Sequence, residues 1–306
     1  MKYCILPVIA GILSAAAAMV AFILYKKSFK NLILSFRPSR HFYYSFVFSA
    51  GFLLGINKTG AAGPYIFEFI AGLILINLLF ISSLAVNHIY DIKIDLANKK
   101  PNTLNLRFIS AGKYSNFYLF TLICTLILSM MFSPYVFAVT AAIHATSWIY
   151  SAPPLRLKRF FPLNIILIAS ATLEAMALGF VLSPGRPPLF LFPPALAASV
   201  VICLSFAFNV KDINDYKGDK KYKITTLMTL LGYTKGKAAA AAASLAGYVL
   251  FPIINGAFSF VPFAWSCGLL TLFFIAVPRR KINETYIFGV FFLFAAVFVI
   301  INPPGF

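Results

Sequence analysis

The chain has 306 residues, of which 61% are hydrophobic and only 11% are charged, against about a quarter charged in an ordinary soluble domain. This composition excludes a disordered tail, a collagen-like fibre and a small disulfide scaffold, and it leaves too little polar surface for a soluble globular domain. The net charge of +18 comes from Lys and Arg in short loops between apolar runs. Membrane topology and anionic lipid explain such residues better than nucleic acid does. The sequence therefore predicts an integral membrane protein that binds no nucleic acid.

Ten apolar segments approach the length of roughly 20 residues that a helix needs to cross a bilayer, and none shows the period-2 alternation of a barrel strand. In chain order they are Ile5–Leu24, Phe42–Ile56, Tyr65–Val86, Phe117–Phe132, Tyr135–Tyr150, Pro162–Leu182, Leu189–Phe208, Ala238–Ile254, Phe260–Val277 and Tyr286–Ile301. The first one precedes most of the nearby positive charge, which favours a retained anchor over a cleaved signal peptide. We therefore predict an all-α polytopic membrane protein with an anchor helix in residues 1–30 and the main domain in residues 31–306.

The basic residues give this topology a test. When the loops are placed alternately on the two sides of the membrane, every Lys and Arg except Lys2, Lys58 and Arg186 falls on one side. The positive-inside rule makes that side cytoplasmic.

The chain has only eight acidic residues, and most of them fall in two short clusters. The first cluster consists of Asn87, Asp91 and Asp95, and the second of Asp212, Asp215 and Asp219. Steps of three or four residues predict that each cluster lies along one face of a helix. Each cluster also follows a span that runs from outside to inside, so both are predicted at the cytoplasmic face.

Carboxylates stacked at the C-terminal end of a helix repel one another and the helix dipole, and a bound hard cation removes both problems. Carboxylate and amide oxygens suit Mg²⁺, which keeps several waters and bridges to phosphates. Lysines lie among both clusters, and the flanking spans are apolar and rich in Phe. The pattern favours a ligand with a phosphate head and a hydrocarbon tail. The alternative is a solvated, charged loop at the ends of two membrane helices.

Taken together, these motifs resemble the UbiA family of intramembrane prenyltransferases. Asn87, Asp91 and Asp95 match its first signature, although His88 stands where that signature usually has its first Asp. The second signature is matched by Asp212, Asp215, Gly218, Asp219, Lys220, Thr226, Leu227, Leu231 and Gly232. The segment from Tyr150 to Arg159 resembles a family loop between the two signatures. The resemblance spans about residues 36 to 302 and implies nine membrane helices, with Ile5–Leu24 as an addition.

The resemblance also implies a Mg²⁺-dependent reaction with two ions, in which a prenyl diphosphate loses its diphosphate and the prenyl group passes to an acceptor. The implied metal or metal-water ligands are Asn87, Asp91, Asp95, Asp212, Asp215 and Asp219, and the implied diphosphate contacts are Arg107, Lys158 and Lys220. Tyr150 would stabilise the allylic cation and, with Asp91, Asp212 and Asp215, form the catalytic set. The leading acceptor is an aromatic quinone precursor, with Arg37 and Glu174 as candidate acceptor residues. Glu174 is equally open to a structural interpretation, as a hydrogen-bonded residue between helices.

Other activities remain open on the same site. They are a glycerol-lipid ether synthase, a phosphoribosyl transferase and a terpene cyclase. A transporter is less favoured because it needs polar groups near the middle of the membrane, and only Glu174 lies deep within a predicted span. An inactive scaffold that has lost metal binding at His88 is the remaining alternative. The sequence predicts no oligomeric state.

Overall fold

The computed structural model describes residues 34–301, except residues 62, 64, 107, 108 and 278–281. Within this part of the chain the fold is entirely helical. The long helices are α3 (Pro38–Thr59), α4 (Ile66–Ala97), α5 (Ala111–Phe132), α6 (Pro134–Ser151), α7 (Leu163–Leu182), α8 (Pro194–Ala207), α11 (Tyr233–Ile254), α12 (Val261–Ala276) and α13 (Glu284–Ile301). The predicted anchor helix in residues 1–30 lies outside the described residues, so the proposed domain boundary stays a prediction.

The helices agree with the predicted spans, with differences at some ends. The largest difference is at α4, which continues to Ala97, beyond the predicted end at Val86. The span predicted from Leu189 begins as a short 3-10 helix, η2 (Leu189–Leu191), and α8 starts only at the proline Pro194. Among the described residues, seven helical segments are long and apolar enough to cross a bilayer. Helices α3 and α6 fall outside this set, because their polar and small residues lower the mean hydropathy. The all-helical membrane fold is confirmed, and the count of nine crossings stays a prediction.

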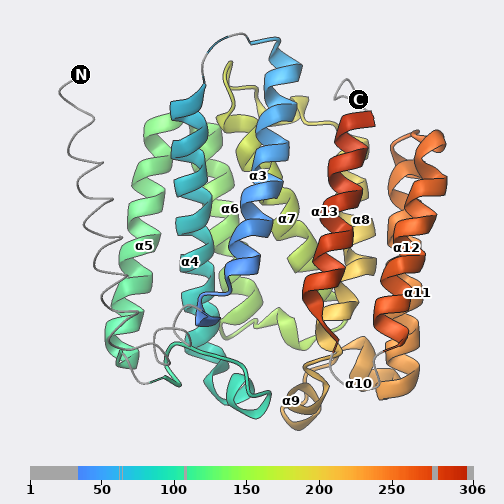
Figure 1. Cartoon of the computed structure of the whole chain (residues 1–306). Helices are drawn as coiled ribbons and strands as arrows, with labels where there is room; N and C mark the ends of the chain where they lie inside the picture. Colours follow the sequence, from blue (N-terminus) through green and yellow to red (C-terminus); the bar gives the residue numbers. More distant parts are fainter. Residues whose placement is uncertain (1–33, 62, 64, 107–108, 278–281, 302–306) are drawn as a thin grey trace, which may run out of the picture.

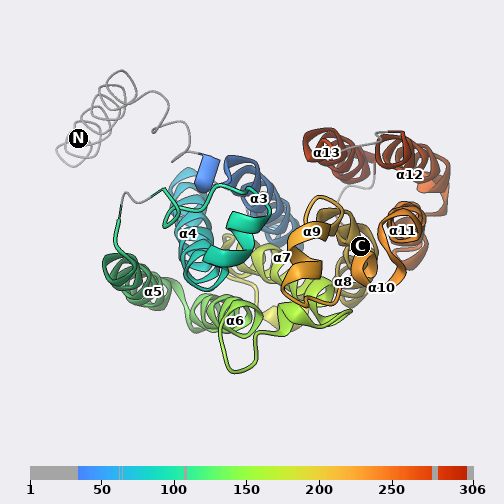
Figure 2. The same ribbon diagram turned by 90° about the horizontal axis from the view of Figure 1, so that it is seen from below.

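The long helices run roughly parallel to one another and form a bundle (Figures 1 and 2). Helix α7 packs against α3, α6 and α8, and α11 packs against α8 and α12. The largest buried cluster joins α3, α4, α6, α7 and α8, and includes Phe48, Leu79 and Phe180. The short helices α9 (Tyr216–Lys221) and α10 (Leu227–Leu231) lie with the segment after α4 at one end of the bundle (Figure 1).

Helices α3 and α7 approach so closely that glycine is required where they cross. A Cβ atom on Gly179 would lie 2.0 Å from the carbonyl oxygen of Phe48, and one on Gly51 would lie 1.9 Å from that of Met176. These contacts are with backbone atoms, so no rotation of a side chain relieves them. Small residues at such crossings allow backbones to pack closely inside membranes.

We therefore expect Gly179→Ala to destabilise the protein by about 1–3 kcal/mol or more, because the added methyl group forces α3 and α7 apart. The matched control is Gly289→Ala in α13, where a Cβ atom meets nothing within 4 Å. Thermal unfolding in detergent, followed by the reaction of buried Cys203 and Cys267 with a thiol dye, measures the effect. Equal unfolding temperatures for the two variants would contradict the close packing of α3 and α7.

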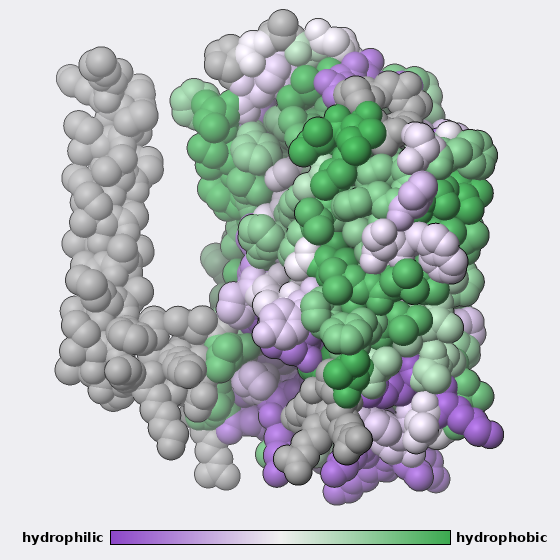
Figure 3. All heavy atoms as spheres, turned by 45° about the vertical axis from the view of Figure 1, so that its right-hand side comes forward, coloured by the Kyte–Doolittle hydropathy of each residue, from purple (hydrophilic) through white to green (hydrophobic). Residues whose placement is uncertain are grey.

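The polar residues gather at one end of the bundle. Figure 3 shows a broad hydrophobic band with hydrophilic residues concentrated at its lower end. Helix α4 has 32 residues and is therefore about 48 Å long, whereas the hydrocarbon core of a bilayer is only about 30 Å thick. Its last turns carry the first acidic cluster to this polar end.

Candidate functional site

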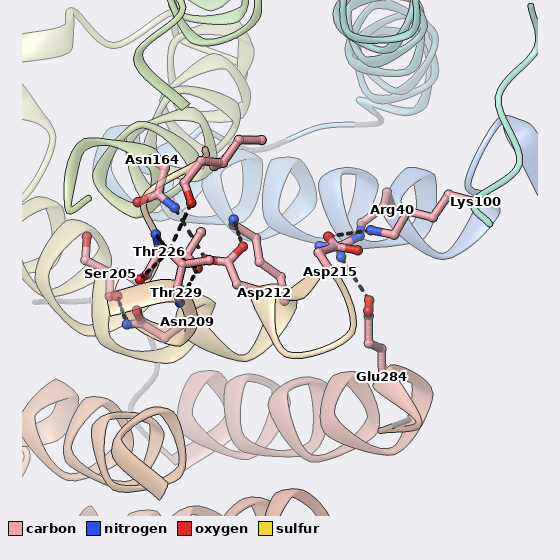
Figure 4. A network of polar contacts seen from close by, with 12 residues as sticks. Arg40, Lys100, Asn164, Ser205, Asn209, Asp212, Asp215, Thr226, Thr229 and Glu284 are labelled. Atoms are coloured by element: carbon pink, nitrogen blue, oxygen red, sulfur yellow. Dashed lines mark hydrogen bonds and ion pairs between the residues drawn. The ribbon is translucent and has the colours of Figure 1, made fainter. Parts of the chain in front are cut away.

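The first acidic cluster forms a stripe on the last turns of α4, as predicted. The helix ends in a Schellman motif: the Lys99 N–H donates to Leu96 O at 3.2 Å and the Lys100 N–H donates to Asp95 O at 2.8 Å. Lys99 adopts a left-handed conformation with φ 55°, which reverses the chain. As a result the Lys100 ammonium reaches Asp215 of the second cluster, 2.6 Å away (Figure 4).

The second acidic cluster is not a continuous α-helix, so the prediction of one helical face was wrong in that respect. Helix α8 ends at Ala207 and continues as a 3-10 helix, η3 (Phe208–Asp212), before a turn and then α9. The Asn209 side chain donates to the carbonyl groups of Ser205 and Phe206, each at 3.0 Å. Such local side-chain bonds compete with the regular helix ladder. Beyond this break Asp215 lies beside Lys100, which follows α4, and Asp212 lies beside Asn164 of α7 (Figure 4).

A glycine joins the two clusters. The Gly218 N–H donates to Asn98 Oδ1 at 2.8 Å, so the start of α9 is fastened to the residue that caps α4. A Cβ atom on Gly218 would lie 2.4 Å from the Asn98 amide, and only glycine allows this approach without a shift. The glycine of the second motif therefore determines the spacing between the two acidic clusters.

Between the clusters lies a cavity of about 230 Å³ at the polar end of the bundle. The sequence-predicted residues that line it are Arg37, Asn87, Asp91, Asp95, Tyr150, Lys158, Asp212, Asp215 and Asp219. Lys220 does not line it: its side chain is exposed, with the ammonium 5.7 Å from the ring centre of Tyr216. Arg107 lies outside the described residues. The first turns of α3, the C-terminal halves of α4 and α6 and the start of α7 complete the wall.

Two basic residues from the loop after α6 bind Asp91. Arg156 donates to Asp91 Oδ1 at 3.0 Å and to Tyr90 O at 2.7 Å, and the buried Lys158 ammonium also contacts Asp91 Oδ1. Arg156 adopts a left-handed conformation with φ 42°, which costs about 1–2 kcal/mol for a residue with a side chain. This turn brings both cations to Asp91, and Lys158 lines the cavity.

The second cluster is paired in the same way. Lys211 contacts Asp212, Lys100 contacts Asp215, and the Asn164 amide donates to Asp212 Oδ2 at 3.3 Å (Figure 4). Asp219 forms none of the ion pairs found among the described residues. Burial, followed by the charges of Asp215 and Asp212, raises the pKa of Asp219 to about 8. Burial and the two neighbouring carboxylates therefore disfavour the charged form of the Asp219 carboxyl in this cavity.

His88 points away from this cavity. It is fully buried, with Nδ1 3.2 Å from the Tyr114 hydroxyl and 3.3 Å from that of Thr103. The Asn102 amide donates both to His88 O and to Asp95 Oδ2. His88 therefore ties α4 to α5 and to the loop between them, and it does not line the wall of the acidic cavity.

Sequence reasoning did not single out five residues that bind the acidic clusters: Lys100, Asn102, Arg156, Asn164 and Lys211. The sequence did contain a signal for the three basic residues, since each of them lies within a matched motif or beside one. Asn164 had none, because nothing in the sequence brings the first turn of α7 next to Asp212.

A second cavity, of about 190 Å³, adjoins the first and is almost entirely apolar. It lies between α3, α8, α11 and α13, and is lined by aromatic residues that include Tyr43, Phe251 and Phe291. Arg40, Lys211 and Glu284 line both cavities. Arg40 and Glu284 form an ion pair at 3.1 Å, so a salt bridge stands where the polar and the apolar space meet.

The donor set of the acidic cavity fits Mg²⁺. The buried oxygens Asn87 Oδ1, Asn164 Oδ1 and Asp215 Oδ1 accept no hydrogen bond, and they face the same cavity as the carboxylates. Among the described residues no group of three His, Cys, Asp or Glu side chains could hold a metal ion by itself. Mg²⁺ usually takes one or two carboxylates and completes its shell with water and phosphate oxygens.

Comparison with known proteins identifies the family. The model of the UbiA prenyltransferase family matches residues 44–293, which is most of the chain. The chain belongs to the UbiA prenyltransferase family. The resemblance inferred from the motifs is thereby confirmed.

Two curated plant proteins are similar to parts of this family member. A homogentisate solanesyltransferase from Arabidopsis thaliana is 32% identical over 155 residues, and a probable homogentisate phytyltransferase from Oryza sativa is 29% identical over 158 residues. Each alignment covers 48% of this chain and 40% of the relative. The matched segment thus spans less than half the length of either relative.

Solved structures show the same fold. A UbiA homologue from Archaeoglobus fulgidus bound to GPP and Mg²⁺ superposes with a TM-score of 0.64 at 18% identity, covering 89% of this chain and 97% of that one. A digeranylgeranylglyceryl phosphate synthase superposes with a TM-score of 0.58 at 19% identity, covering 91% and 97%. At this level of identity the likeness establishes the UbiA-type helical bundle.

Proposed function

We propose that this UbiA family member is a Mg²⁺-dependent prenyltransferase that moves a prenyl group from a prenyl diphosphate to an aromatic acceptor. The observation that carries the proposal is the meeting of two acidic clusters around one cavity that adjoins an apolar one. The polar cavity suits a metal-bound diphosphate, and the apolar cavity suits a hydrocarbon tail. The similarity to homogentisate prenyltransferases favours an aromatic acceptor.

In this proposal the residues divide into three groups. Asn87, Asp91, Asp212 and Asp215 hold Mg²⁺, supported by Asp95 and Asp219. Bound Mg²⁺ would neutralise charge that develops on the departing diphosphate. The second group is cationic and comprises Lys100, Arg156, Lys158 and Lys211, which face the same cavity or bind its carboxylates. The third is Tyr150, whose ring is placed to stabilise an allylic cation.

The surroundings of the cavity favour transfer to an acceptor over reaction with water. The helical bundle encloses its sides, and the loop carrying Lys158 together with α9 covers its polar end. Excluding water protects a reactive cation from hydrolysis. We place this end of the bundle at the cytoplasmic face, because the basic residues that the positive-inside rule assigns to the cytoplasm lie there.

The experiment that tests the proposal identifies the product. Purified protein in lipid nanodiscs receives geranylgeranyl diphosphate with homogentisate, 4-hydroxybenzoate, a glycerol-phosphate lipid or no acceptor, and products are identified by mass spectrometry. We expect a prenylated aromatic ring and pyrophosphate, formed only when Mg²⁺ is present. A prenyl glycerol ether would assign the protein to the ether synthases, and a cyclic hydrocarbon formed without acceptor would assign it to the cyclases. Either result would overturn the aromatic acceptor.

A further inference from the structure

The first residue of α13 brings a carboxylate to the border between the two cavities. Glu284 lines both the polar and the apolar cavity, yet it belongs to neither acidic cluster and the proposed function gives it no role. A carboxylate in the first turn of a helix is favoured by the helix dipole. Each of its two oxygens has its own partner, and one of these partners lies between Asp212 and Asp215 of the second acidic cluster.

That partner is Asn214, whose side-chain amide is bound at both ends. Its Nδ2 group donates to Glu284 Oε1 at 3.2 Å and to Ile282 O at 3.1 Å. Its Oδ1 atom accepts from the Ile282 N–H at 3.0 Å. The amide therefore pairs with the backbone just before α13 and with the carboxylate that begins this helix. These bonds fix the orientation of Asn214, and with it the backbone between Asp212 and Asp215.

The turn between Asp212 and Asp215 needs such outside contacts because it is not part of a regular helix. It connects η3 to α9, and within it the Asp215 N–H donates to Asp212 O at 3.2 Å. Ile213 of this turn is buried in the same apolar cluster as Ile282. Packing and hydrogen bonds from the start of α13 thus hold the turn that carries two of the predicted metal ligands.

The second oxygen of Glu284 binds α3. Glu284 Oε2 accepts from the Arg40 guanidinium at 3.1 Å. The guanidinium carbon also lies 4.8 Å from the ring centre of Phe288, one turn farther along α13, so the carboxylate and the ring hold the cation together. Figure 4 shows Arg40, Asp215 and Glu284 close to one another. One carboxylate therefore joins α3, α13 and the turn of the second acidic cluster.

We propose that Glu284 is a positioning residue for the metal site and that it acts through Asn214. With the Asn214 amide held in place, Asp212 and Asp215 keep the arrangement in which both line the polar cavity. Arg40 in turn holds the Glu284 carboxylate in the orientation that meets Asn214. This inference rests on the proposed function and adds to it the residue that aligns the second acidic cluster.

Calorimetric titration of Mg²⁺ in the presence of saturating geranylgeranyl thiolodiphosphate, an unreactive analogue of a prenyl diphosphate, tests this inference. Removing the partner of a metal-binding group typically weakens metal affinity about 10- to 100-fold, and we expect a loss of this size for Glu284→Leu. Glu284→Gln should keep most of the affinity, because its amide oxygen still accepts a hydrogen bond from Asn214. Asn214→Leu should show the same loss as Glu284→Leu, which keeps the inference testable if one of the two variants does not fold.

The double variant tests whether Glu284 acts through Asn214. Two residues that act through one shared bond do not give additive losses. We therefore expect Glu284→Leu to cost no further Mg²⁺ affinity when Asn214→Leu is already present. A full additional loss in the double variant would show that Glu284 acts on the metal by another route and would overturn the inference.

Asn283→Ala is the matched control for a disturbed start of α13. Asn283 is exposed, and its Oδ1 atom accepts from the Thr285 N–H at 3.0 Å, so the variant removes a bond at the helix start without touching Asn214. Its Mg²⁺ affinity should equal that of the wild type. Equal weakening in Asn283→Ala and Glu284→Leu would show a structural role only and would contradict the positioning role.

The wild-type protein separates failure of this inference from failure of the proposed function. If the wild type binds the thiolodiphosphate with Mg²⁺ and Glu284→Leu binds Mg²⁺ equally tightly, the role of Glu284 is wrong while the proposed function stands. If the wild type binds no thiolodiphosphate in Mg²⁺, the proposed function itself is wrong and the inference fails with it. Equal losses in Glu284→Gln and Glu284→Leu would show that the metal requires the charge of Glu284 rather than its bond to Asn214, which would also overturn the inference.

Discussion

Replacing Asp91 or Asp212 by Asn should lower prenyl transfer about 10²- to 10³-fold, the usual cost of removing one group that stabilises charge developing in a transition state. Asn has nearly the same size as Asp but lacks its charge, so the change acts on metal binding more than on packing. Each carboxylate lies on a different acidic cluster, one at the end of α4 and one at the end of η3. Loss of activity in both variants would show that the two clusters act as one site. Pyrophosphate release from protein in nanodiscs measures the effect.

A second property of the Asn variants distinguishes loss of metal binding from loss of folding. In Asp91→Asn the cations Arg156 and Lys158 lose their carboxylate partner, so they become free to bind a diphosphate without metal. We expect this variant to bind pyrophosphate in EDTA at least as well as the wild type does, although its prenyl transfer is strongly lowered. Glu68→Gln, which removes an exposed carboxylate in the first turn of α4, should leave both properties unchanged. Full activity in Asp91→Asn would contradict the role of the first cluster.

The second large effect concerns Lys158, whose ammonium contacts Asp91. A Mg²⁺ ion that binds Asp91 must compete with this ammonium, and a diphosphate offers the displaced ammonium a new partner. We therefore expect Lys158→Met to bind Mg²⁺ alone more tightly than the wild type. Its affinity for a prenyl diphosphate analogue in Mg²⁺ should fall about 30-fold or more, as expected for truncating one partner of a buried charge pair.

Calorimetric titration of Mg²⁺ and of the analogue separates these opposite changes. Lys217→Met is the matched control, because Lys217 lies within the second acidic motif but is exposed and does not line the cavity. Lower Mg²⁺ affinity in Lys158→Met would contradict the competition between the ammonium and the metal. An unchanged affinity for the analogue would show that Lys158 does not contact the diphosphate.

Local patterns in the sequence predicted much of this fold, because membrane helices are determined by runs of apolar residues. The span predicted as Pro162–Leu182, for example, is the helix Leu163–Leu182. Proline and local side-chain bonds caused the differences: η2 precedes α8, and Asn209 helps to break the second motif. The stripe on α4 was predicted correctly, because its spacing lies within one continuous helix.

The ion pairs and hydrogen bonds within the site could not be predicted in the same way. The bonds from Lys100 to Asp215 and from Arg156 to Asp91 join residues that are 115 and 65 positions apart. They depend on how the helices pack and on the left-handed turns at Lys99 and Arg156, which a single sequence does not reveal. The same holds for Glu174: its position deep within a membrane span was predicted, but the hydrogen bond that it accepts from the Thr146 hydroxyl was not.

The central claim is that the two acidic clusters form one Mg²⁺-dependent binding site for a prenyl diphosphate. The most direct test is a calorimetric titration of geranylgeranyl thiolodiphosphate into the wild-type protein in nanodiscs, with Mg²⁺ and then with EDTA. We predict that Mg²⁺ strengthens binding at least about tenfold, within the usual range of coupling between two ligands. Equal affinity in Mg²⁺ and in EDTA would contradict the claim, because the carboxylates would then have no metal-mediated part in holding the diphosphate.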